Sequence, residues 1–182
     1  GKEISVNLVD VKVQAEGYAA LKVLTQHIDK DNTTLIIDIG MRTTDVLLIE
    51  WNGKFTISNY GTTNIALYDI YKVLQDKIAS EGVEVTIEQI DKKFQSNKPV
   101  IRTEKGEFNL TENLGGTVHI CRDIMKDIEN KFGKTILHDK AFVGGGAEKF
   151  LEAVDGKVRN NVEVDRELRW WGNALGYIVS LN

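Results

Sequence analysis

The segment at 33–45 restricts the fold of this chain more than any other stretch. Residues 33–39 form an apolar run rich in β-branched side chains, which is typical of a strand buried in a central sheet. The run carries one carboxylate, Asp38, near its end, and Gly40 starts a tight turn toward a second apolar run at 46–49. A buried strand that turns directly into a neighbour predicts an α/β fold with this strand in the central sheet.

Apolar residues recur with strand or helix spacing along the rest of the chain. The patterns predict a strand at 4–13, a helix at 15–27, a hairpin of 46–49 with 55–58, helices at 63–80 and 86–94, a hairpin at 100–110, a helix at 111–132, a strand at 141–143, a helix at 147–154, a strand at 158–164 and a helix from 166. Thr86 and Gln89 have the spacing of a capping box. In the last helix, Trp171 shares a face with Leu168 and Leu175, so we expect it in the core.

Composition excludes several classes of protein. Of the 182 residues, 42% are hydrophobic and 27% are charged, as in an ordinary globular domain. The net charge of −4 is scattered along the chain and gives no reason to expect direct nucleic-acid binding. Cys121 is the single cysteine, which excludes an intrachain disulfide and favours the cytoplasm. No apolar run approaches the roughly 20 residues that cross a bilayer, and no signal peptide is evident, so we expect no membrane partner.

The segment around Asp38 has the composition of a phosphate-binding turn. Asp38 can hold a hydrated Mg²⁺, and Gly40 lets the backbone approach a phosphate closely. The hydroxyl groups of Thr43 and Thr44, with the N–H groups of the turn, can donate to phosphate oxygens. An ordinary β-turn made of turn-favouring residues is the alternative interpretation.

A second candidate segment joins a short strand to a helix through three glycines. Gly144, Gly145 and Gly146 follow the apolar run at 141–143 and lead directly into Ala147. A loop without Cβ atoms can lie flat against a nucleotide, and a helix start offers free N–H groups to an anion. A tight turn without a ligand is the alternative, because glycine clusters also serve that purpose.

Together, and about a hundred residues apart, the two segments resemble the phosphate-2 and adenosine motifs of the actin, sugar kinase and heat-shock chaperone superfamily. The Asp-Ile-Gly-x-x-Thr-Thr-Asp and Gly-Gly-Gly-Ala-Glu segments resemble most those of ParM-type plasmid-segregation actins of bacteria, phages and archaea. The resemblance covers essentially the whole chain. It implies a ribonuclease-H-like, actin-like ATPase domain, with a mixed central sheet flanked by helices and a small inserted lobe.

The resemblance also implies a ligand, Mg-ATP, and roles for particular residues. Asp38 becomes the catalytic carboxylate linked to Mg²⁺, and Glu16 the residue that orients the attacking water, with Gln14 as the second candidate. Glu16 can equally be an acid favoured at a helix start. The resemblance places Gly40, Thr43 and Thr44 around the β- and γ-phosphates. Next to the adenosine and α-phosphate it places Gly144, Gly145, Gly146 and Ala147.

Some features depart from the family pattern. Met41 and Arg42 stand where many relatives have small residues, and Arg42 either reaches a phosphate or is a solvated turn residue. The family's first phosphate loop is not in this sequence, which starts without methionine and is expected to be cut from a longer protein. The chain would then supply one wall of the ATP cleft, and the missing N-terminal half the other. Alone, it should bind nucleotide poorly.

The implied domains are a nucleotide-binding domain at 1–82 and 134–182, and an inserted lobe at 83–133 that holds the small hairpin and the long helix. The implied function is an ATPase that polymerises with itself into filaments, for plasmid or DNA segregation, with a DNA-binding adaptor protein as a further partner. A metabolic sugar-type kinase and a non-catalytic scaffold are the alternatives. Trp51 and Trp170 are candidates for filament contacts. The three histidines are candidates for surface or capping roles: His27, His119 and His138.

Overall fold

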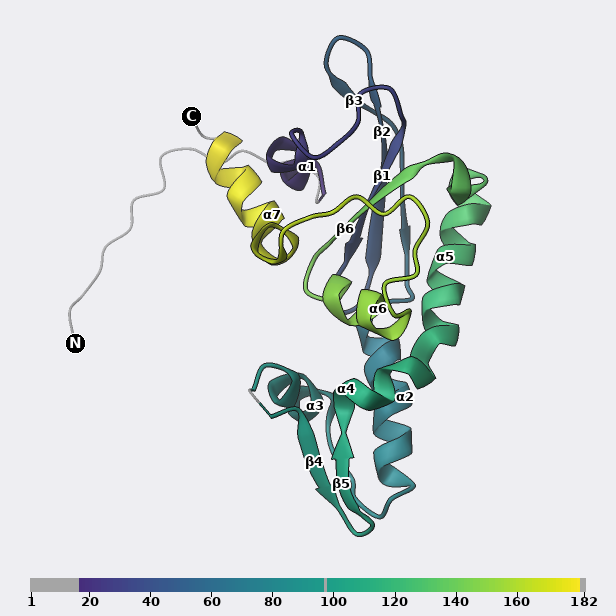
Figure 1. Ribbon diagram of the computed structural model, residues 1–182, viewed down its shortest axis with the longest axis vertical. Coiled ribbons are helices and arrows are strands. Elements are labelled where there is room, and N and C mark those ends of the chain that lie inside the picture. Colours follow the sequence, from purple (N-terminus) through teal and green to yellow (C-terminus); the bar gives the residue numbers. More distant parts are fainter. Residues whose placement is uncertain (1–16, 97, 181–182) are drawn as a thin grey trace, which may run out of the picture.

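The computed structural model describes residues 17–96 and 98–180, and its centre is a mixed sheet in the order β3-β2-β1-β6 (Figure 1). The strands are β1 (Thr34–Ile39), β2 (Thr44–Trp51), β3 (Phe55–Thr63) and β6 (Asp139–Val143). β1 pairs antiparallel with β2 and parallel with β6, and all six of its residues are buried. The expected mixed central sheet is therefore confirmed, with the apolar run at 33–39 inside it.

Helices cover both faces of the sheet, because side chains of β1 alternate between two apolar clusters. Leu35 and Ile37 face the cluster formed with α2 (Leu67–Ala79), α5 (Val118–Phe132) and α6 (Ala147–Ala153). Ile36 faces the other cluster, to which α1 (Tyr18–Leu24) and α7 (Arg166–Ser180) contribute. In Figure 1, α1 and α7 accordingly lie on one side of the strands and α5 on the other. The domain has the three layers of an α/β fold.

A smaller lobe packs alongside α2, below the central sheet in the view of Figure 1. It contains α3 (Ile87–Phe94), the hairpin of β4 (Val100–Thr103) with β5 (Gly106–Asn109), and the short α4 (Leu110–Asn113). The predicted capping box is confirmed. The Thr86 hydroxyl accepts a hydrogen bond from the backbone N–H of Gln89 at 3.2 Å, and the side-chain oxygen of Gln89 accepts one from the backbone N–H of Thr86 at 2.8 Å. α5 leads from this lobe to the sheet, where Lys131 donates to the Thr62 carbonyl.

Two predicted elements are corrected by the structure. The single helix expected at 111–132 is interrupted by a 3₁₀ turn, η1 (Leu114–Thr117), which contains Gly115 and Gly116. Glycine is a poor helix former, so two glycines in succession favour an interruption of the α-helix here. The strand expected at 158–164 is reduced to an isolated parallel bridge between Lys140 and Asn161.

Other differences concern the ends of elements and one side chain. The helix expected from residue 63 begins at Leu67, because β3 stays paired with β2 as far as Thr63. Trp171 was expected in the core and is 60% exposed. The strand expected at 4–13 lies outside the described residues, as does the start of the helix expected at 15–27. Among residues 17–96 and 98–180, no helix is long and apolar enough to cross a membrane.

Candidate functional site

The two glycine-containing motifs lie side by side, at the carboxyl ends of the neighbouring strands β1 and β6. Asp38 of β1 is paired with Val143 of β6 in parallel register, so Gly144 follows at the carboxyl end of the neighbouring strand. The Asp38 side chain is buried and lies so close to Gly144 that a Cβ there would collide with its carboxylate. The carboxyl ends of adjacent strands are a common place for ligands in α/β sheets.

A side chain of the last helix holds the Asp38 carboxylate. The amide nitrogen of Asn173 donates a short hydrogen bond to Asp38 Oδ2. The amide oxygen of the same side chain accepts from the backbone N–H of Gly17 at 3.0 Å. Asn173 thus connects the end of β1 to the start of α1. Glu16, Gln14 and the rest of the segment before Gly17 lie outside the described residues.

The turn at 40–43 is fixed against the start of α2. The Gly40 amide donates to the Thr43 carbonyl at 2.9 Å, which closes the turn. The Gly40 carbonyl accepts from Leu67 at 3.2 Å, and the Met41 carbonyl accepts from Tyr68 at 2.9 Å. These contacts use the first free N–H groups of α2 and give the turn a defined position beside the lobe.

The two threonines of the turn have different environments. Thr44 is fully buried, and its hydroxyl donates to the Ile65 carbonyl at 2.8 Å. Thr43 is half-buried, and its hydroxyl makes a long contact of 3.5 Å with the Asp45 carboxylate. The Thr44 hydroxyl therefore already has a protein acceptor, whereas that of Thr43 stands nearer the surface.

The three glycines have distinct positions in their loop. Gly144 has a φ of +87°, a conformation that glycine adopts most easily, and its amide donates to the Arg169 carbonyl at 2.8 Å. Gly146 donates to the Ile39 carbonyl at 2.8 Å, and a Cβ there would collide with Ile39. Gly145 is exposed, with open space in front of it. The outer two glycines thus fix the loop against β1, and Gly145 faces outward.

A cavity of about 400 Å³ opens in front of Gly145, between α6, α7 and the lobe. Glu148 and Lys149 line it from α6, and Arg166 and Trp170 from α7. The lobe and α2 contribute Tyr71, Asp91, Phe94, Gln95 and Ser96. A second cavity, of about 590 Å³, shares Asp91 and Gln95 with the first and reaches the turn at Met41 and Arg42. Asp91 and Gln95 line both cavities, which are therefore adjacent, and we refer to the pair as the hollow.

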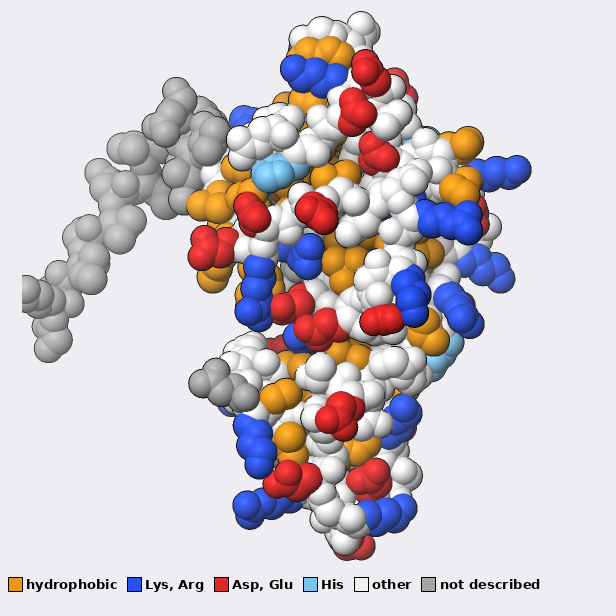
Figure 2. All heavy atoms as spheres, in the orientation of Figure 1, with side chains coloured by type: hydrophobic (Ala, Val, Ile, Leu, Met, Phe, Trp, Pro, Cys, Tyr) orange, Lys and Arg blue, Asp and Glu red, His pale blue; other side chains and the backbone are white. Residues whose placement is uncertain are grey.

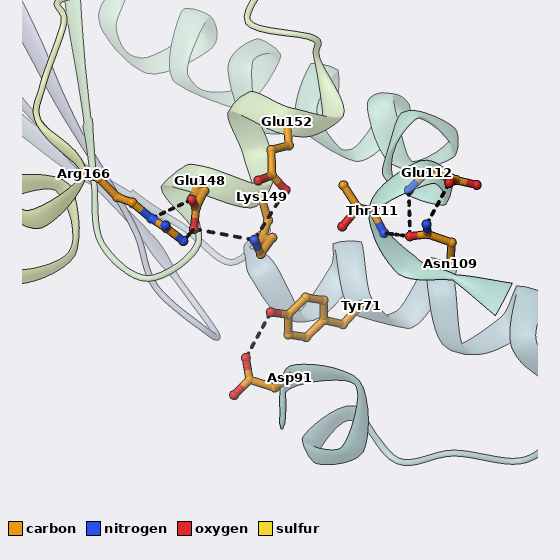
Figure 3. A network of polar contacts seen from close by, with 9 residues as sticks. All are labelled: Tyr71, Asp91, Asn109, Thr111, Glu112, Glu148, Lys149, Glu152 and Arg166. Carbon is orange, nitrogen blue, oxygen red and sulfur yellow. Dashed lines mark hydrogen bonds and ion pairs between the residues drawn. The ribbon is translucent and has the colours of Figure 1, made fainter. Parts of the chain in front are cut away.

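Charged groups at the first cavity are arranged in a chain (Figure 3). Glu148 lies between Arg166, whose Nε is 2.9 Å from its carboxylate, and Lys149, whose Nζ is 3.6 Å away. Lys149 is buried, contacts Glu152 at 3.4 Å, and lies 4.9 Å from the centre of the Phe94 ring. This ammonium therefore connects α6 of the main domain with α3 of the lobe.

Aromatic and acidic groups complete the lobe side of the cavity. Tyr71 stacks on Phe94 with 5.4 Å between ring centres, and its hydroxyl donates to Asp91 at 3.0 Å (Figure 3). Burial, with a smaller effect of the Asp91 charge, raises the pKa of Tyr71 above its ordinary value. The phenol is therefore a neutral hydrogen-bond donor at physiological pH. Arg42 lies over the Tyr68 ring at 4.1 Å, on the wall of the second cavity.

Sequence reasoning missed several of these residues. The two motifs include none of Asn173, Lys149, Arg166 and Tyr71, which lie on the helices α7, α6 and α2. Asn173 gives the clearest signal, as a polar residue within the otherwise apolar stretch at 170–178. Tyr71 follows the apolar spacing of α2, which conceals the position of its hydroxyl group.

Comparison with known proteins identifies the fold. Residues 36–156, more than half of the chain, match the family described as the C-terminal domain of the MreB-like archaeal actin homologue. No curated protein matches the sequence. Among solved structures, the archaeal actin homologue Ta0583, in complex with ADP, is 22% identical, with a TM-score of 0.74 over 92% of this chain and 56% of that one.

Bacterial structures are similar as well. A 15-stranded ParM filament from Clostridium botulinum is 17% identical, with a TM-score of 0.67 over 92% of this chain and 51% of the ParM chain. ParM from Bacillus thuringiensis with ATP is 15% identical, with a TM-score of 0.56 over 82% of this chain and 46% of that one. The chain thus spans about half the length of these structures, and its similarity to them confirms the actin-like fold. By its sequence, this chain belongs to the family of MreB-like archaeal actin homologues, as the C-terminal domain.

Proposed function

We propose that this chain is the nucleotide-binding second half of an actin-like ATPase, which binds Mg-ATP in a cleft between this half and an N-terminal half of the same protein. The observation that carries the proposal is the adjacency of Asp38 and the glycine loop at the carboxyl ends of two neighbouring strands, with a cavity in front of Gly145 and a second cavity beside the turn at 40–43. A carboxylate for the metal and an open loop for the nucleotide then stand on neighbouring strands.

The hollow suits a nucleotide. Its smaller cavity has the size of a small-molecule site, with aromatic groups at Tyr71 and Trp170 and hydrogen-bonding groups at Asp91 and Gln95. Gly145 leaves space where the sugar and α-phosphate would lie, and the cavity at Met41 and Arg42 extends toward the phosphates. The ADP complex of Ta0583 supports this assignment, because that protein shares the fold.

The residues also fit a magnesium ion that arrives with the nucleotide. Within the described part of the chain, no group of three His, Cys, Asp or Glu side chains is arranged for a metal. Mg²⁺ in nucleotide sites needs no such cluster, because water and phosphate oxygens supply most of its ligands and one or two carboxylates the rest. Asp38 would be that carboxylate. When bound, the ion neutralises charge on the phosphates.

The remaining residues receive complementary roles. Thr43 would donate to the β- and γ-phosphates, and Gly40, whose own N–H closes the turn on Thr43, would let the backbone approach them closely. Thr44 would contribute through its backbone, because its hydroxyl is bonded to Ile65. Gly144, Gly146 and Ala147 would shape the loop around the adenosine and α-phosphate, with Gly145 in direct contact. Glu16 would orient the attacking water, with Gln14 as the second candidate.

At the level of the whole protein, we propose self-assembly into filaments in the cytoplasm, with ATP binding favouring assembly and hydrolysis weakening it. A repeated head-to-tail contact of one chain with the next produces an open filament. The ParM filament structure supports this step through the common fold. Segregation of plasmids or other DNA, through a DNA-binding adaptor protein, is the physiological role that we propose.

The test uses the full-length protein that contains this chain. Nucleotide affinity is measured by calorimetry with Mg-ATP and Mg-ADP, and assembly by light scattering with electron microscopy. The variants are Asp38→Ala, Gly145→Val and, as a control outside the hollow, Lys54→Ala in the β2–β3 turn. We expect filaments only with nucleotide, and loss of binding in the first two variants alone.

Other outcomes would redirect the proposal. Unchanged affinity in both Asp38→Ala and Gly145→Val would contradict the site. Nucleotide binding without any polymer, together with phosphate transfer to an added sugar, would assign the protein to the kinases of the same superfamily. Binding with neither polymer nor turnover would identify a scaffold.

A further inference from the structure

A second hollow lies away from the nucleotide site, between α5, α6 and the segment at 154–159. Its volume is about 650 Å³. The floor is apolar, with Val118, Cys121 and Met125 from α5 and Phe150, Ala153, Val154 and Val158 from the opposite wall. We call this feature the α5 groove. In the view of Figure 2, several Lys and Arg side chains gather on the side of the molecule where α5 lies.

The charges around the α5 groove are mostly positive, although the chain carries a net charge of −4. Five basic residues line the groove: Arg122, Lys126, Lys140, Lys157 and Arg159. The two acidic residues are Glu129 and Asp155, and Asp155 is paired with Lys157 at 2.8 Å. Among the described residues, no carboxylate forms an ion pair with the other four cations. The groove therefore presents an excess of unneutralised positive charge.

Lys140 gives independent evidence that the groove is suited to an anion. Its side chain is 97% buried (3% exposed), and Nζ donates to the carbonyls of His138 at 2.9 Å and Arg159 at 3.0 Å. Burial disfavours the charged ammonium and lowers the pKa of Lys140, and the charge of the neighbouring Asp139 carboxylate offsets part of this effect. An anionic ligand in the groove would stabilise the ammonium further.

The shape of the groove indicates the type of ligand. Its lining residues on α5 recur from Val118 to Glu129 at spacings of three and four, so the groove follows this helix for about 16 Å, or three turns. A groove of that length with an apolar floor and a charged rim suits an amphipathic helix better than a compact metabolite. Ile136, 47% exposed at one end, adds an apolar contact that the isolated chain leaves in water.

We propose that the α5 groove binds an amphipathic helix of a partner protein, with its apolar face on Val118, Met125 and Phe150 and acidic residues against Arg122 and Lys126. This site is separate from the hollow assigned to the nucleotide, and it does not depend on the proposed function. Arg122 and Lys126 are both exposed on successive turns of α5, so they can meet acids spaced by three or four residues.

The test uses the full-length protein and a fluorescent peptide of about 15 residues, enough for the three turns of the groove with flanking residues. Leucines form one helical face of the peptide, and glutamates form the other. A second peptide has the same composition in an order without an apolar face. Fluorescence anisotropy measures binding to the unchanged protein, to Arg122→Glu/Lys126→Glu, and to the matched control Lys30→Glu/Lys54→Glu. The control reverses two exposed charges near the β2–β3 turn.

We expect micromolar binding of the amphipathic peptide to the unchanged protein and to the control variant. The Arg122→Glu/Lys126→Glu variant should bind about tenfold more weakly or worse, as expected for two lost charge pairs. Absence of binding, equal binding of the reordered peptide, or equal affinity of both variants would overturn the proposal. So would a change of self-association in sedimentation without a change of peptide binding, which would make the groove a contact between copies.

Discussion

Asn173 occupies a position from which it controls the Asp38 carboxylate. Its side chain donates a hydrogen bond to that carboxylate and at the same time accepts one from the backbone N–H at the start of α1. One side-chain amide therefore connects two backbone elements with the proposed metal-linked acid. Asn173 would be a positioning residue, since it acts through Asp38.

Replacing Asn173 with leucine should weaken Mg-ATP binding by roughly tenfold, because a hydrogen bond to a charged group contributes about 1.5–3 kcal/mol. Asn173→Gln keeps the amide and should recover part of the affinity. Calorimetry at several Mg²⁺ concentrations distinguishes a misplaced Asp38 from a general loss of stability. A misplaced Asp38 changes the Mg²⁺ dependence of the ATP affinity, whereas a general loss of stability does not. Equal affinity in Asn173→Leu and the unchanged protein would contradict this role.

Cys121 should be unreactive in the folded protein. Burial raises the pKa of its thiol to about 12, and the sulfur points toward the Phe150 carbonyl at 3.9 Å. The thiolate is the reactive form, so alkylation by iodoacetamide at pH 8 should be at least about 100-fold slower than in urea-unfolded protein. Mass spectrometry gives both rates. Rapid labelling under native conditions would show that the floor of the α5 groove opens to solvent.

The same thiol gives a pH dependence with a definite sign. In the unfolded chain it loses its proton near its ordinary pKa of 9.0, whereas in the folded chain it does so only near 12. The folded state then binds more protons between these values, and its stability falls as the pH rises through this window.

Individual residues illustrate which parts of the site a sequence can predict. Asp38 and Gly144 could be named as candidates because a carboxylate at a strand end and a glycine before a helix are local patterns, and the parallel register brings the two residues together. Trp171 was misassigned, because helical spacing identifies a face and not what covers it. The contact of Asn173 with Asp38 spans 135 residues, and no local pattern reports such a pair.

At the scale of elements, the contact between α1 and α7 depends on glycine. A Cβ on Gly176 would overlap the carbonyl oxygen of Ala19, a backbone atom that cannot move aside easily. A Cβ on Gly172, one turn earlier on the same helix, would meet Ala20 Cβ at an ordinary 3.5 Å. The two positions thus form a matched pair in which the same substitution meets different surroundings.

Gly176→Ala should destabilise the protein by about 1–3 kcal/mol, as overpacking does in a close interface. Gly172→Ala should be neutral or stabilising by up to about 1 kcal/mol, because alanine is the better helix former. Urea unfolding followed by circular dichroism measures both. Equal destabilisation by the two changes would mean that α7 tolerates an added side chain at neither position. If both changes were tolerated equally well, α1 and α7 would have to separate readily.

Elements were predicted well where local chemistry decides them and poorly where long-range contacts do. The capping box at Thr86 and the hairpin that joins 46–49 to 55–58 depend on neighbours in sequence, and both were found as expected. The helix at 111–132 failed at Gly115-Gly116, since apolar spacing continues across a pair of residues that the backbone does not keep α-helical. The strand at 158–164 lacks a full partner, because only Asn161 bridges to β6.

At the scale of the whole molecule, the hollow assigned to the nucleotide lies where the lobe meets the main domain. Gly145 and Glu148 line it from the main domain, whereas Phe94 and Gln95 line it from α3 of the lobe. The Lys149 ammonium, which lies over the Phe94 ring, connects the two sides of the cavity. A ligand that fills the cavity would therefore add contacts between two parts of the fold.

Mg-ADP should accordingly slow hydrogen exchange in α3 and the β4–β5 hairpin more than in the central sheet. If opening of the lobe requires release of the ligand, exchange there slows by about 100-fold when the ligand concentration is 100 times its Kd. Exchange in β1, which is buried between two layers, should change little. Mass spectrometry on the full-length protein, with Asp38→Ala as the control, measures both regions. Protection confined to the sheet, or equal in every element, would mean that the nucleotide does not connect the lobe to the main domain.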